Sequence, residues 1–421
     1  ETARAVVLVS TLLLFESSMY SALTPLLPHY ADTLHLAKPA VGLLTACYPI
    51  GIVSGSLLGA WAAARLGVRR ATVIGLVLLA AAVVPFGFGD DVTLLDGLRL
   101  LQGIGCGFIW VGGLTWVIGG AEKHRRGQML GSVFAAAIVG TILGPILGTL
   151  ATSVGTAPVF VLVGAVALGL ACWTRGHPKP SFTRDPEEGR PTLRALLANR
   201  GLALGAGLIL LEAATVGATS TLIPLRLSRL GGSELLIGGT FVVGSLLSAL
   251  LARPIGRATD RHGPRPPLWL GLPATAVLMA LLTLPTSPVL LGLVTAVVYG
   301  GPLTLYTVPA TTILTDASEL AGIPIVVASM VLNLGWALGE ALGAPFAANL
   351  SQLGGDSLPL LGLAAVMLAT LWPVTRHAAP GPAAAPVAAA GSPNAPELEP
   401  KVGGHAAPPQ QAHDSRAAAW R

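Results

Sequence analysis

LLLFESSMYSALTPLLP at residues 12–28 is matched 196 positions later by LILLEAATVGATSTLIP at residues 208–224. Glu16 falls on Glu212 in this alignment, and each stretch ends in a proline. Repetition at one fixed, long period indicates a duplicated structural unit. Both copies run in the same direction along the chain, so the sequence predicts two similar units in parallel orientation.

The composition excludes most classes of soluble protein. The chain has 421 residues, of which 53% are hydrophobic and only 11% are charged, and its mean hydropathy is +0.72. Soluble globular domains carry about 25% charged residues. A soluble enzyme, a disordered protein and a nucleic-acid-binding protein are therefore not expected, although the sequence pI is about 9.4.

Twelve long apolar segments follow one another with short interruptions. A membrane-spanning helix needs about 20 apolar residues, and only helices and closed barrels satisfy a backbone in lipid. The segments are continuously apolar rather than alternating, which excludes a barrel. They lie approximately at residues 5–29, 39–64, 71–89, 92–119, 127–152, 155–174, 201–225, 234–257, 267–285, 288–315, 322–348 and 357–375.

We therefore expect an all-α integral membrane protein with twelve transmembrane helices in two pseudo-symmetric six-helix bundles. The N-terminal bundle takes residues 1–174, and the C-terminal bundle takes residues 201–375. A polar cytoplasmic loop at 175–200 joins them. The tail at 376–421 is rich in Ala, Pro and Gly and cannot bury a core, so we expect it to be disordered.

Lys and Arg are distributed unequally between the two sides of these spans. With the N-terminus inside, eighteen of them fall in inner segments, and three, Lys38, Arg226 and Arg229, fall in outer loops. Positive charge accumulates on the cytoplasmic side of membrane proteins. Both termini are therefore expected in the cytoplasm. The high content of Ala, Gly, Arg and Pro suggests a bacterial source, which would place the protein in the inner (plasma) membrane.

Four local patterns carry a resemblance to a known family. They are Pro25-Leu26-Leu27-Pro28, Arg99-Leu100-Leu101-Gln102-Gly103, the glycine series of residues 140–148, and the loop at residues 256–265. Together with the duplicated spans, these patterns resemble the major facilitator superfamily over roughly residues 5–375, and within it the proton-coupled drug antiporter branch. The resemblance implies two bundles that rock around a substrate site near the membrane midplane.

Four ionisable residues are expected inside the membrane: Glu16, Glu212 and Glu340 in apolar spans, and Arg99 about two turns into another. Intramembrane charges are costly and usually face a cavity or a partner. We expect Glu16 and Glu212 to line the central cavity and to carry protons or bind a cationic substrate. Arg99 is expected to approach Glu16 or Asp96 and to tune the carboxylate, and Glu340 to lie at a cavity edge. Structural carboxyls and a fixed packing ion pair are the alternative interpretations.

Five aromatic residues accompany these charges: Tyr20, Trp110, Tyr299, Tyr306 and Trp336. Aromatic faces beside carboxylates bind lipophilic cations through cation–π contacts. We therefore assign the five aromatic residues, together with the two matched glutamates, to substrate binding. Ordinary packing within the helix bundle is the alternative for each aromatic residue.

One candidate for gating is the glycine series in the fifth span. Gly140, Gly144 and Gly148 recur on one face of the helix, and Pro145 introduces a kink there. Small residues let membrane helices approach closely. We expect this smooth face to slide against a helix of the other bundle, with ordinary small-residue packing as the alternative.

The second candidate for gating is a pair of matched loops on the inner side. They contain Arg65, Gly67 and Arg69 in the first half, and Gly256, Asp260, Arg261, Gly263 and Arg265 in the second half. Asp260 is expected to accept hydrogen bonds from Arg side chains or to cap a neighbouring helix. Such contacts would latch the two bundles in the outward-open state, and a simple positive anchor is the alternative.

No motif indicates an enzyme. The chain has no G-x-x-x-x-G-K-[ST] run, so an ion gradient is the expected energy source. Its three cysteines show no metal-binding or redox spacing, and we expect neither metal nor cofactor.

The expected function is therefore secondary active transport: proton-coupled efflux of small lipophilic compounds, cations among them, by alternating access. The expected partners are a small-molecule substrate, protons and the lipid bilayer, with no nucleic acid, and the carrier is expected to be a monomer. A dedicated exporter or symporter of a single metabolite or sugar is one alternative. A non-transporting membrane receptor or scaffold is another.

Overall fold

The structure is a computed structural model that describes residues 2–120, 126–178, 199–323 and 325–377, and its regular elements in these ranges are all helices. Most of the predicted central loop and almost all of the predicted tail lie outside these residues. The first half contains α1 (Thr2–Ser21), α2 (Leu23–Thr33), α3 (Lys38–Leu66), α4 (Val68–Phe86), α5 (Val92–Gly120), α6 (Arg126–Val154) and α7 (Thr156–Gly176). The second half contains α9 (Arg200–Arg229), α10 (Glu234–His262), α11 (Arg265–Leu281), α12 (Pro288–Gly300), α13 (Pro302–Leu320), α14 (Ile325–Gly354) and α15 (Ser357–His377).

The described helices account for the twelve predicted membrane crossings. Eleven helical segments are long and apolar enough to cross a membrane, and α1 with α2, like α12 with α13, counts as one segment. The twelfth crossing is α11, whose 17 residues reach the lower end of the length that a bilayer requires. The prediction of an all-helical membrane protein with two related bundles is confirmed.

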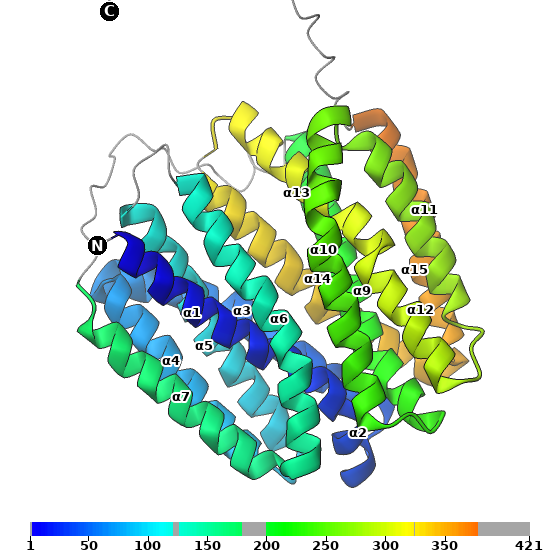
Figure 1. The fold of residues 1–421 in the computed structure, drawn as a ribbon, viewed down its shortest axis with the longest axis horizontal. Coiled ribbons are helices and arrows are strands. Elements are labelled where there is room, and N and C mark those ends of the chain that lie inside the picture. Colours follow the sequence, from blue (N-terminus) through cyan, green and yellow to red (C-terminus); the bar gives the residue numbers. More distant parts are fainter. Residues whose placement is uncertain (1, 121–125, 179–198, 324, 378–421) are drawn as a thin grey trace, which may run out of the picture. The chain divides into compact units, whose positions relative to one another are not determined.

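Each half of the chain packs around its own apolar core. The N-terminal bundle is α1–α7 and the C-terminal bundle is α9–α15, and most helix contacts lie within one bundle. Figure 1 shows them beside each other, the first running from blue to teal and the second from green to orange. The boundary between them, named the seam here, is crossed chiefly by α3 against α14, α6 against α10, and α2 against α9.

Two glycines make the same tight turn at equivalent places in the two bundles. Gly67 joins α3 to α4 with a φ of 88°, and Gly263 joins α10 to α11 with a φ of 79°. L side chains rarely adopt this left-handed region, whereas glycine adopts it freely. These two turns mark the inner end of the bundles, following the orientation predicted from the charges. The opposite end, where α2 meets α3, is the outer end.

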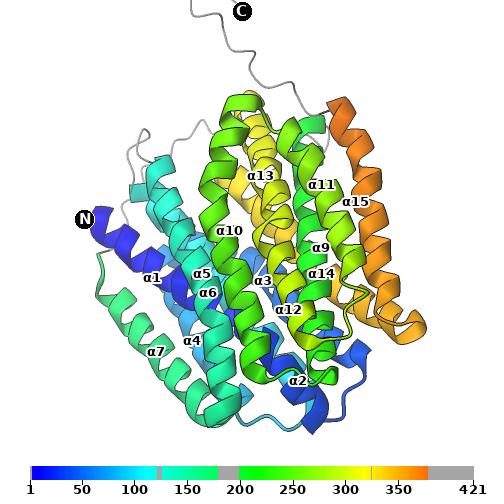
Figure 2. The ribbon, with the colours of Figure 1, turned by 45° about the vertical axis from the view of Figure 1, so that its right-hand side comes forward.

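The bundles approach each other closely at two symmetric points towards the outer end. A Cβ on Gly42 of α3 would lie 2.6 Å from the Ala348 Cβ of α14. A Cβ on Gly238 of α10 would lie 2.0 Å from the Thr149 Oγ1 of α6. Figure 2 shows α6 and α10 side by side. Gly238 follows Gly42 by the same 196 positions that relate the repeated segments. Equivalent glycines of the two halves therefore make equivalent contacts across the seam.

An ion cluster joins the bundles at the same end. Lys38, which begins α3, donates hydrogen bonds to Asp356 at 2.6 Å and to Ser351 at 2.6 Å. Arg229 of α9 and Ser351 of α14 also bind the Asp356 carboxyl. Burial raises the pKa of Asp356, but the hydrogen bonds from Lys38 and Ser351 and the charge of Arg229 lower it by more. Its pKa therefore lies below the usual value of 3.8.

Gly42→Val should prevent the outer end from closing without disturbing the packing inside either bundle. Overpacking costs about 1–3 kcal/mol, enough to shift carriers about fivefold or more towards the outward-open state. We expect a cysteine placed at Asn333, in a Cys172→Ser background, to react more slowly with a thiol reagent applied from the inner side. Gly131→Val is the control, because a Cβ there would meet nothing within 4 Å. Equal labelling in the two variants would contradict this interpretation of the seam.

Asp356→Asn should destabilise the protein in a pH-dependent way. The folded state lowers the pKa of Asp356, so its ionised form stabilises the fold above about pH 3.8, and this contribution disappears as the pH falls through the folded-state pKa. We expect the free energy of unfolding of the variant to be about 1 kcal/mol lower than that of the wild type at pH 7. In strong acid the two proteins should be equally stable. Thermal unfolding of both proteins in detergent across this pH range measures the difference in stability. A difference that is the same at every pH would exclude the charge of Asp356 as its cause.

Candidate functional site

The carboxyl group of Glu16 lies at the centre of the N-terminal bundle and is almost completely buried. Its Oε1 accepts hydrogen bonds from the Tyr48 hydroxyl of α3 and the Cys106 thiol of α5, both at 2.7 Å. Its Oε2 accepts from the Trp110 indole N–H at 2.7 Å and from the Ser17 hydroxyl at 3.3 Å. All four donors belong to the same bundle as Glu16, so they can travel with it when the bundles move.

Arg99 does not make the ion pair that the sequence predicts. Within the described residues it pairs with neither Glu16 nor Asp96. Its guanidinium carbon lies 4.3 Å from the centre of the Tyr48 ring, and one of its nitrogens donates to the Gln102 side chain at 3.0 Å. Tyr48 therefore stands between Arg99 and Glu16, with its ring against the cation and its hydroxyl on the carboxyl.

Glu340 joins the two bundles near the middle of the seam. It lies on α14 and is buried, and its Oε1 accepts a hydrogen bond of 2.5 Å from the Tyr20 hydroxyl of α1. Its Oε2 has no hydrogen-bond partner. The Tyr20 ring also packs edge-on against Trp336, with 5.1 Å between ring centres. The structure thus brings three predicted site residues from opposite halves of the chain into contact.

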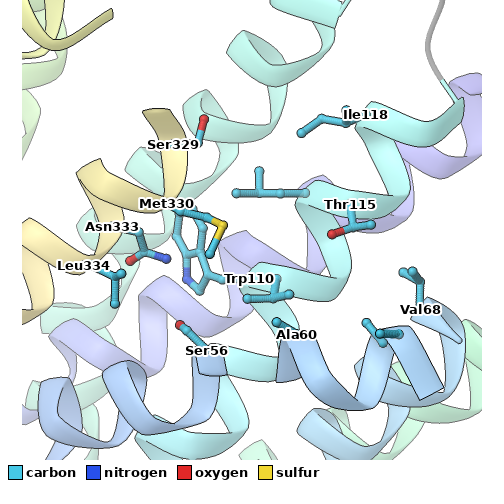
Figure 3. A pocket seen from close by; sticks show the side chains of 14 residues that line it. Ser56, Ala60, Val68, Trp110, Thr115, Ile118, Ser329, Met330, Asn333 and Leu334 are labelled. Carbon is cyan, nitrogen blue, oxygen red and sulfur yellow. The ribbon is translucent and has the colours of Figure 1, made fainter. Parts of the chain in front are cut away.

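A cavity between the bundles begins on the inner side of these contacts. One part, of about 500 Å³, lies between α3, α5 and α14 (Figure 3). A second part, of about 270 Å³, reaches Glu16, Tyr20 and Trp336. Both parts are lined by Trp110, Leu114, Ser329 and Asn333, so they form one central cavity. Its walls are mainly apolar, and they include Ala60, Ala63, Leu114, Ile118, Phe134, Met330 and Trp336.

Three predicted site residues of the C-terminal bundle, Glu212, Tyr299 and Tyr306, lie outside this cavity. Glu212 is buried in α9 beside the Thr307 side chain, and it does not line either part of the central cavity. The hydroxyl of Tyr299 shares a 2.8 Å hydrogen bond with Thr219. Tyr306 is completely buried, and its hydroxyl donates to a backbone carbonyl of α9. The assignment of Tyr306 to substrate binding is therefore wrong for this conformation, because the side chain belongs to the core.

The expectation for the glycines of α6 is also wrong in one respect. A Cβ on Gly140, Gly144 or Gly148 would meet Leu14, Ser18, Ser21 or Ala22, all in or next to α1. The smooth face therefore packs within its own bundle. The contact with the other bundle uses the carbonyl of Pro145 and the side chain of Thr149, which lie against Gly238. Spacing predicted the close approach correctly, but it cannot specify which neighbouring helix is approached.

The residues of the predicted latch form no contact with one another across the seam among the described residues. Arg65 lies over the Trp61 ring at 5.4 Å, and Arg69 donates to the His177 carbonyl at 3.0 Å. Asp260 forms no hydrogen bond or ion pair within the described residues. A Cβ on Gly256 would meet nothing within 4 Å, and the Nε of Arg265 has no hydrogen-bond partner among the described residues. The latch predicted at Asp260 and Arg261 is not formed among the described residues, and it stays a prediction.

Sequence reasoning missed several residues of the site. Tyr48 and Cys106 bind Glu16, and Ser56 and Asn333 line the central cavity. Tyr48 and Cys106 sit in apolar spans where they are indistinguishable from packing residues. Within the part of the chain that the structure describes, no group of His, Cys, Asp or Glu could hold a metal ion.

The family model for the Major Facilitator Superfamily matches residues 9–340. The chain belongs to this superfamily. Relatives include the uncharacterised MFS-type transporter YcaD of Escherichia fergusonii, which is 27% identical over 382 residues, or 89% of this chain and 96% of the relative. YcaD of Shigella flexneri is 26% identical over the same coverage.

Solved structures of this superfamily share the fold. A D-xylose–proton symporter superimposes with a TM-score of 0.69 at 17% identity, over 88% of this chain and 96% of its own. The nucleoside transporter NupG gives 0.69 at 13% identity, over 88% and 98%. A bacterial homologue of the human lysosomal transporter Spinster, solved inward-facing, gives 0.67 at 15% identity, over 90% and 95%. The protein is thus a multi-pass membrane carrier of a superfamily whose members are generally not enzymes.

Tyr48→Phe should destabilise the carrier, because it removes one of the hydrogen bonds that the buried Oε1 of Glu16 accepts. Such a loss costs about 1–3 kcal/mol. Tyr30→Phe is the matched control, since the Tyr30 hydroxyl makes only a 3.5 Å contact with a carbonyl. Unfolding of the purified variants in detergent provides the measurement. Equal losses in both variants would mean that the Glu16 contact contributes nothing specific.

Proposed function

We propose that this carrier exports small lipophilic cations in exchange for protons, by alternating access. The observation that carries the proposal is the position of Glu16, a carboxyl at the end of an apolar, aromatic-walled cavity that lies on the inner side of the seam contacts. A substrate entering from the inner side would meet apolar surface first and the carboxyl last.

The chemistry of the cavity favours this substrate class over a sugar. Ligand sites of about 300–1,000 Å³ accommodate drug-sized molecules, and both parts of the central cavity together fall in that range. Trp110, Trp336 and Tyr20 offer aromatic faces, which attract cations. A sugar needs many hydrogen-bonding groups around it, whereas the walls here are mostly Ala, Leu, Ile, Met and aromatic side chains.

The proposed cycle exchanges a proton for the substrate at Glu16. A cation that enters from the cytoplasm displaces the proton, the inner end closes, and the outer contacts at Gly42, Gly238, Tyr20–Glu340 and Asp356 separate. The substrate leaves, and a proton from outside returns to the carboxyl. We place this monomeric carrier in a bacterial inner membrane with both termini in the cytoplasm, as the charge distribution predicts.

The other intramembrane charges keep supporting roles in this proposal. Glu340 has one free oxygen at the seam, so it can change partner when the bundles separate. Arg99 acts on Glu16 through Tyr48, whose ring and hydroxyl contact the two groups. Glu212 is the equivalent of Glu16 by duplication, and it is the second candidate for the coupled proton.

Inside-out vesicles with an acidic interior test the exchange. A pH-sensitive dye reports proton efflux when lipophilic cations, neutral drugs or sugars are added. We expect lipophilic cations to trigger efflux, Glu16→Gln to abolish it, and Glu234→Gln to leave it unchanged. Glu234 is a matched acid that lies exposed at the first turn of α10.

The other outcomes separate the alternatives. Proton movement triggered only by a sugar would replace the proposal with a metabolite symporter or exporter. A response to cations that survives in Glu16→Gln would transfer the coupled proton to Glu212 or Glu340. No response to any compound, from protein that is folded and inserted, would overturn proton exchange as the function.

A further inference from the structure

The helices α3 and α14 touch near the outer end and diverge towards the inner end. Gly42 of α3 approaches Ala348 of α14 so closely that a Cβ would collide. Farther along the same two helices, the larger part of the central cavity separates Ser56 of α3 from Asn333 of α14. The two residues therefore face one space from opposite bundles, as Figure 3 shows.

Neither polar side chain is satisfied by the protein. Ser56 is 7% exposed, and its hydroxyl has no hydrogen-bond partner. Within the described residues, no hydrogen bond engages the carboxamide of Asn333, and Figure 3 shows this group close to Trp110. A buried hydroxyl without a partner costs about 1–3 kcal/mol, so an unpaired Ser56 at the wall of a cavity points to a ligand group that satisfies it.

Apart from the hydroxyls of Thr115 and Ser329, the side chains around this pair are apolar or already engaged. The indole N–H of Trp110 donates to Glu16, so Trp110 presents only its ring to this part of the cavity. Met330 and Leu334 flank Asn333 on α14. A ligand that lies between the two helices therefore finds hydrogen-bonding capacity at Ser56 and Asn333, separated by apolar surface from the carboxyl of Glu16.

We propose that Ser56 and Asn333 form a neutral hydrogen-bonding subsite, which recognises a carboxamide or carbonyl group carried by the transported cation. An amide matches both residues, because a hydroxyl and a carboxamide can each donate and accept. This inference rests on the proposed function and narrows its substrate class to cations with a neutral polar group on an apolar body.

The subsite also explains how binding would favour closure of the inner end. Asn333, Trp336 and Glu340 are spaced as i, i+3 and i+7 on α14, so they share the face that lies on the seam. A ligand held by both Ser56 and Asn333 bridges the two bundles where they diverge. Its binding free energy therefore favours the conformation in which α3 and α14 approach each other.

Two matched cations test the subsite on the purified, full-length protein: tetraphenylphosphonium and its para-carbamoyl derivative. Quenching of Trp fluorescence reports binding, because Trp110 and Trp336 line the cavity. We expect Asn333→Leu and Ser56→Ala to weaken binding of the carbamoyl derivative about 3- to 10-fold, the loss of one neutral hydrogen bond. Binding of tetraphenylphosphonium should stay unchanged, and in transport kcat/KM should fall for the carbamoyl derivative alone.

The chain offers a matched control for each variant. Asn349→Leu changes an exposed asparagine on the same helix. Ser54→Ala changes a half-buried serine two residues from Ser56, whose hydroxyl bonds backbone carbonyls of its own helix. Neither should alter either affinity. If both cations bind and all four variants have the same affinities for them as the wild type, the subsite is wrong and the proposed function stands. If neither cation binds to the wild type, the proposed substrate class is wrong, and the subsite falls with it.

Discussion

Close contact across the seam at Gly42 and Gly238 is the constraint on which the rest of the structure depends. A Cβ on Gly42 would collide with Ala348 and the backbone of α14, and a Cβ on Gly238 would displace the Thr149 hydroxyl. Because the two contacts are related by the duplication, they close the outer end symmetrically, and a single rocking motion can release both. The cavity exists because the same helices, α3 and α14, separate towards the inner end while they touch at the outer end.

The buried charges fall into two groups according to where their partners lie. Glu16 takes all of its hydrogen bonds from its own bundle, through Ser17, Tyr48, Cys106 and Trp110. Its environment can therefore survive a change of conformation, which suits the exchange of substrate and proton proposed above for this site. Glu340 and Asp356 instead take hydrogen bonds from the opposite bundle. These contacts have to break when the outer end opens, so they contribute to the relative stability of the two conformations.

Much of the fold could be predicted from sequence, because hydropathy and duplication are long-range patterns that need no knowledge of side-chain contacts. The glycine series in α6 shows the limit of such patterns. Spacing reveals that Gly140, Gly144 and Gly148 form a smooth helix face, but the partner of that face depends on how six helices are arranged. The seam glycines could have been found, since Gly42 and Gly238 differ by the repeat distance, yet glycine is so common in this chain that the match carries little information by itself.

Site residues could be predicted from the sequence where their residue type is rare in membrane helices, and they could not be predicted where that type is common. A glutamate in an apolar span is costly, so Glu16 and Glu340 stood out, and the aromatic residues next to them on the same helices followed from spacing. Tyr48, Ser56 and Asn333 belong to residue types that membrane helices often contain for packing. Only the structure shows that Tyr48 contacts Glu16 and Arg99 and that Ser56 and Asn333 line the cavity. The duplication matches Glu212 with Glu16, yet Glu212 does not line the cavity described here, because the two halves share a fold while their equivalent positions have different neighbours. In this conformation the N-terminal bundle supplies the carboxyl and the C-terminal bundle supplies the opposite wall, so the ligand proposed above would contact both bundles and would couple binding to their motion.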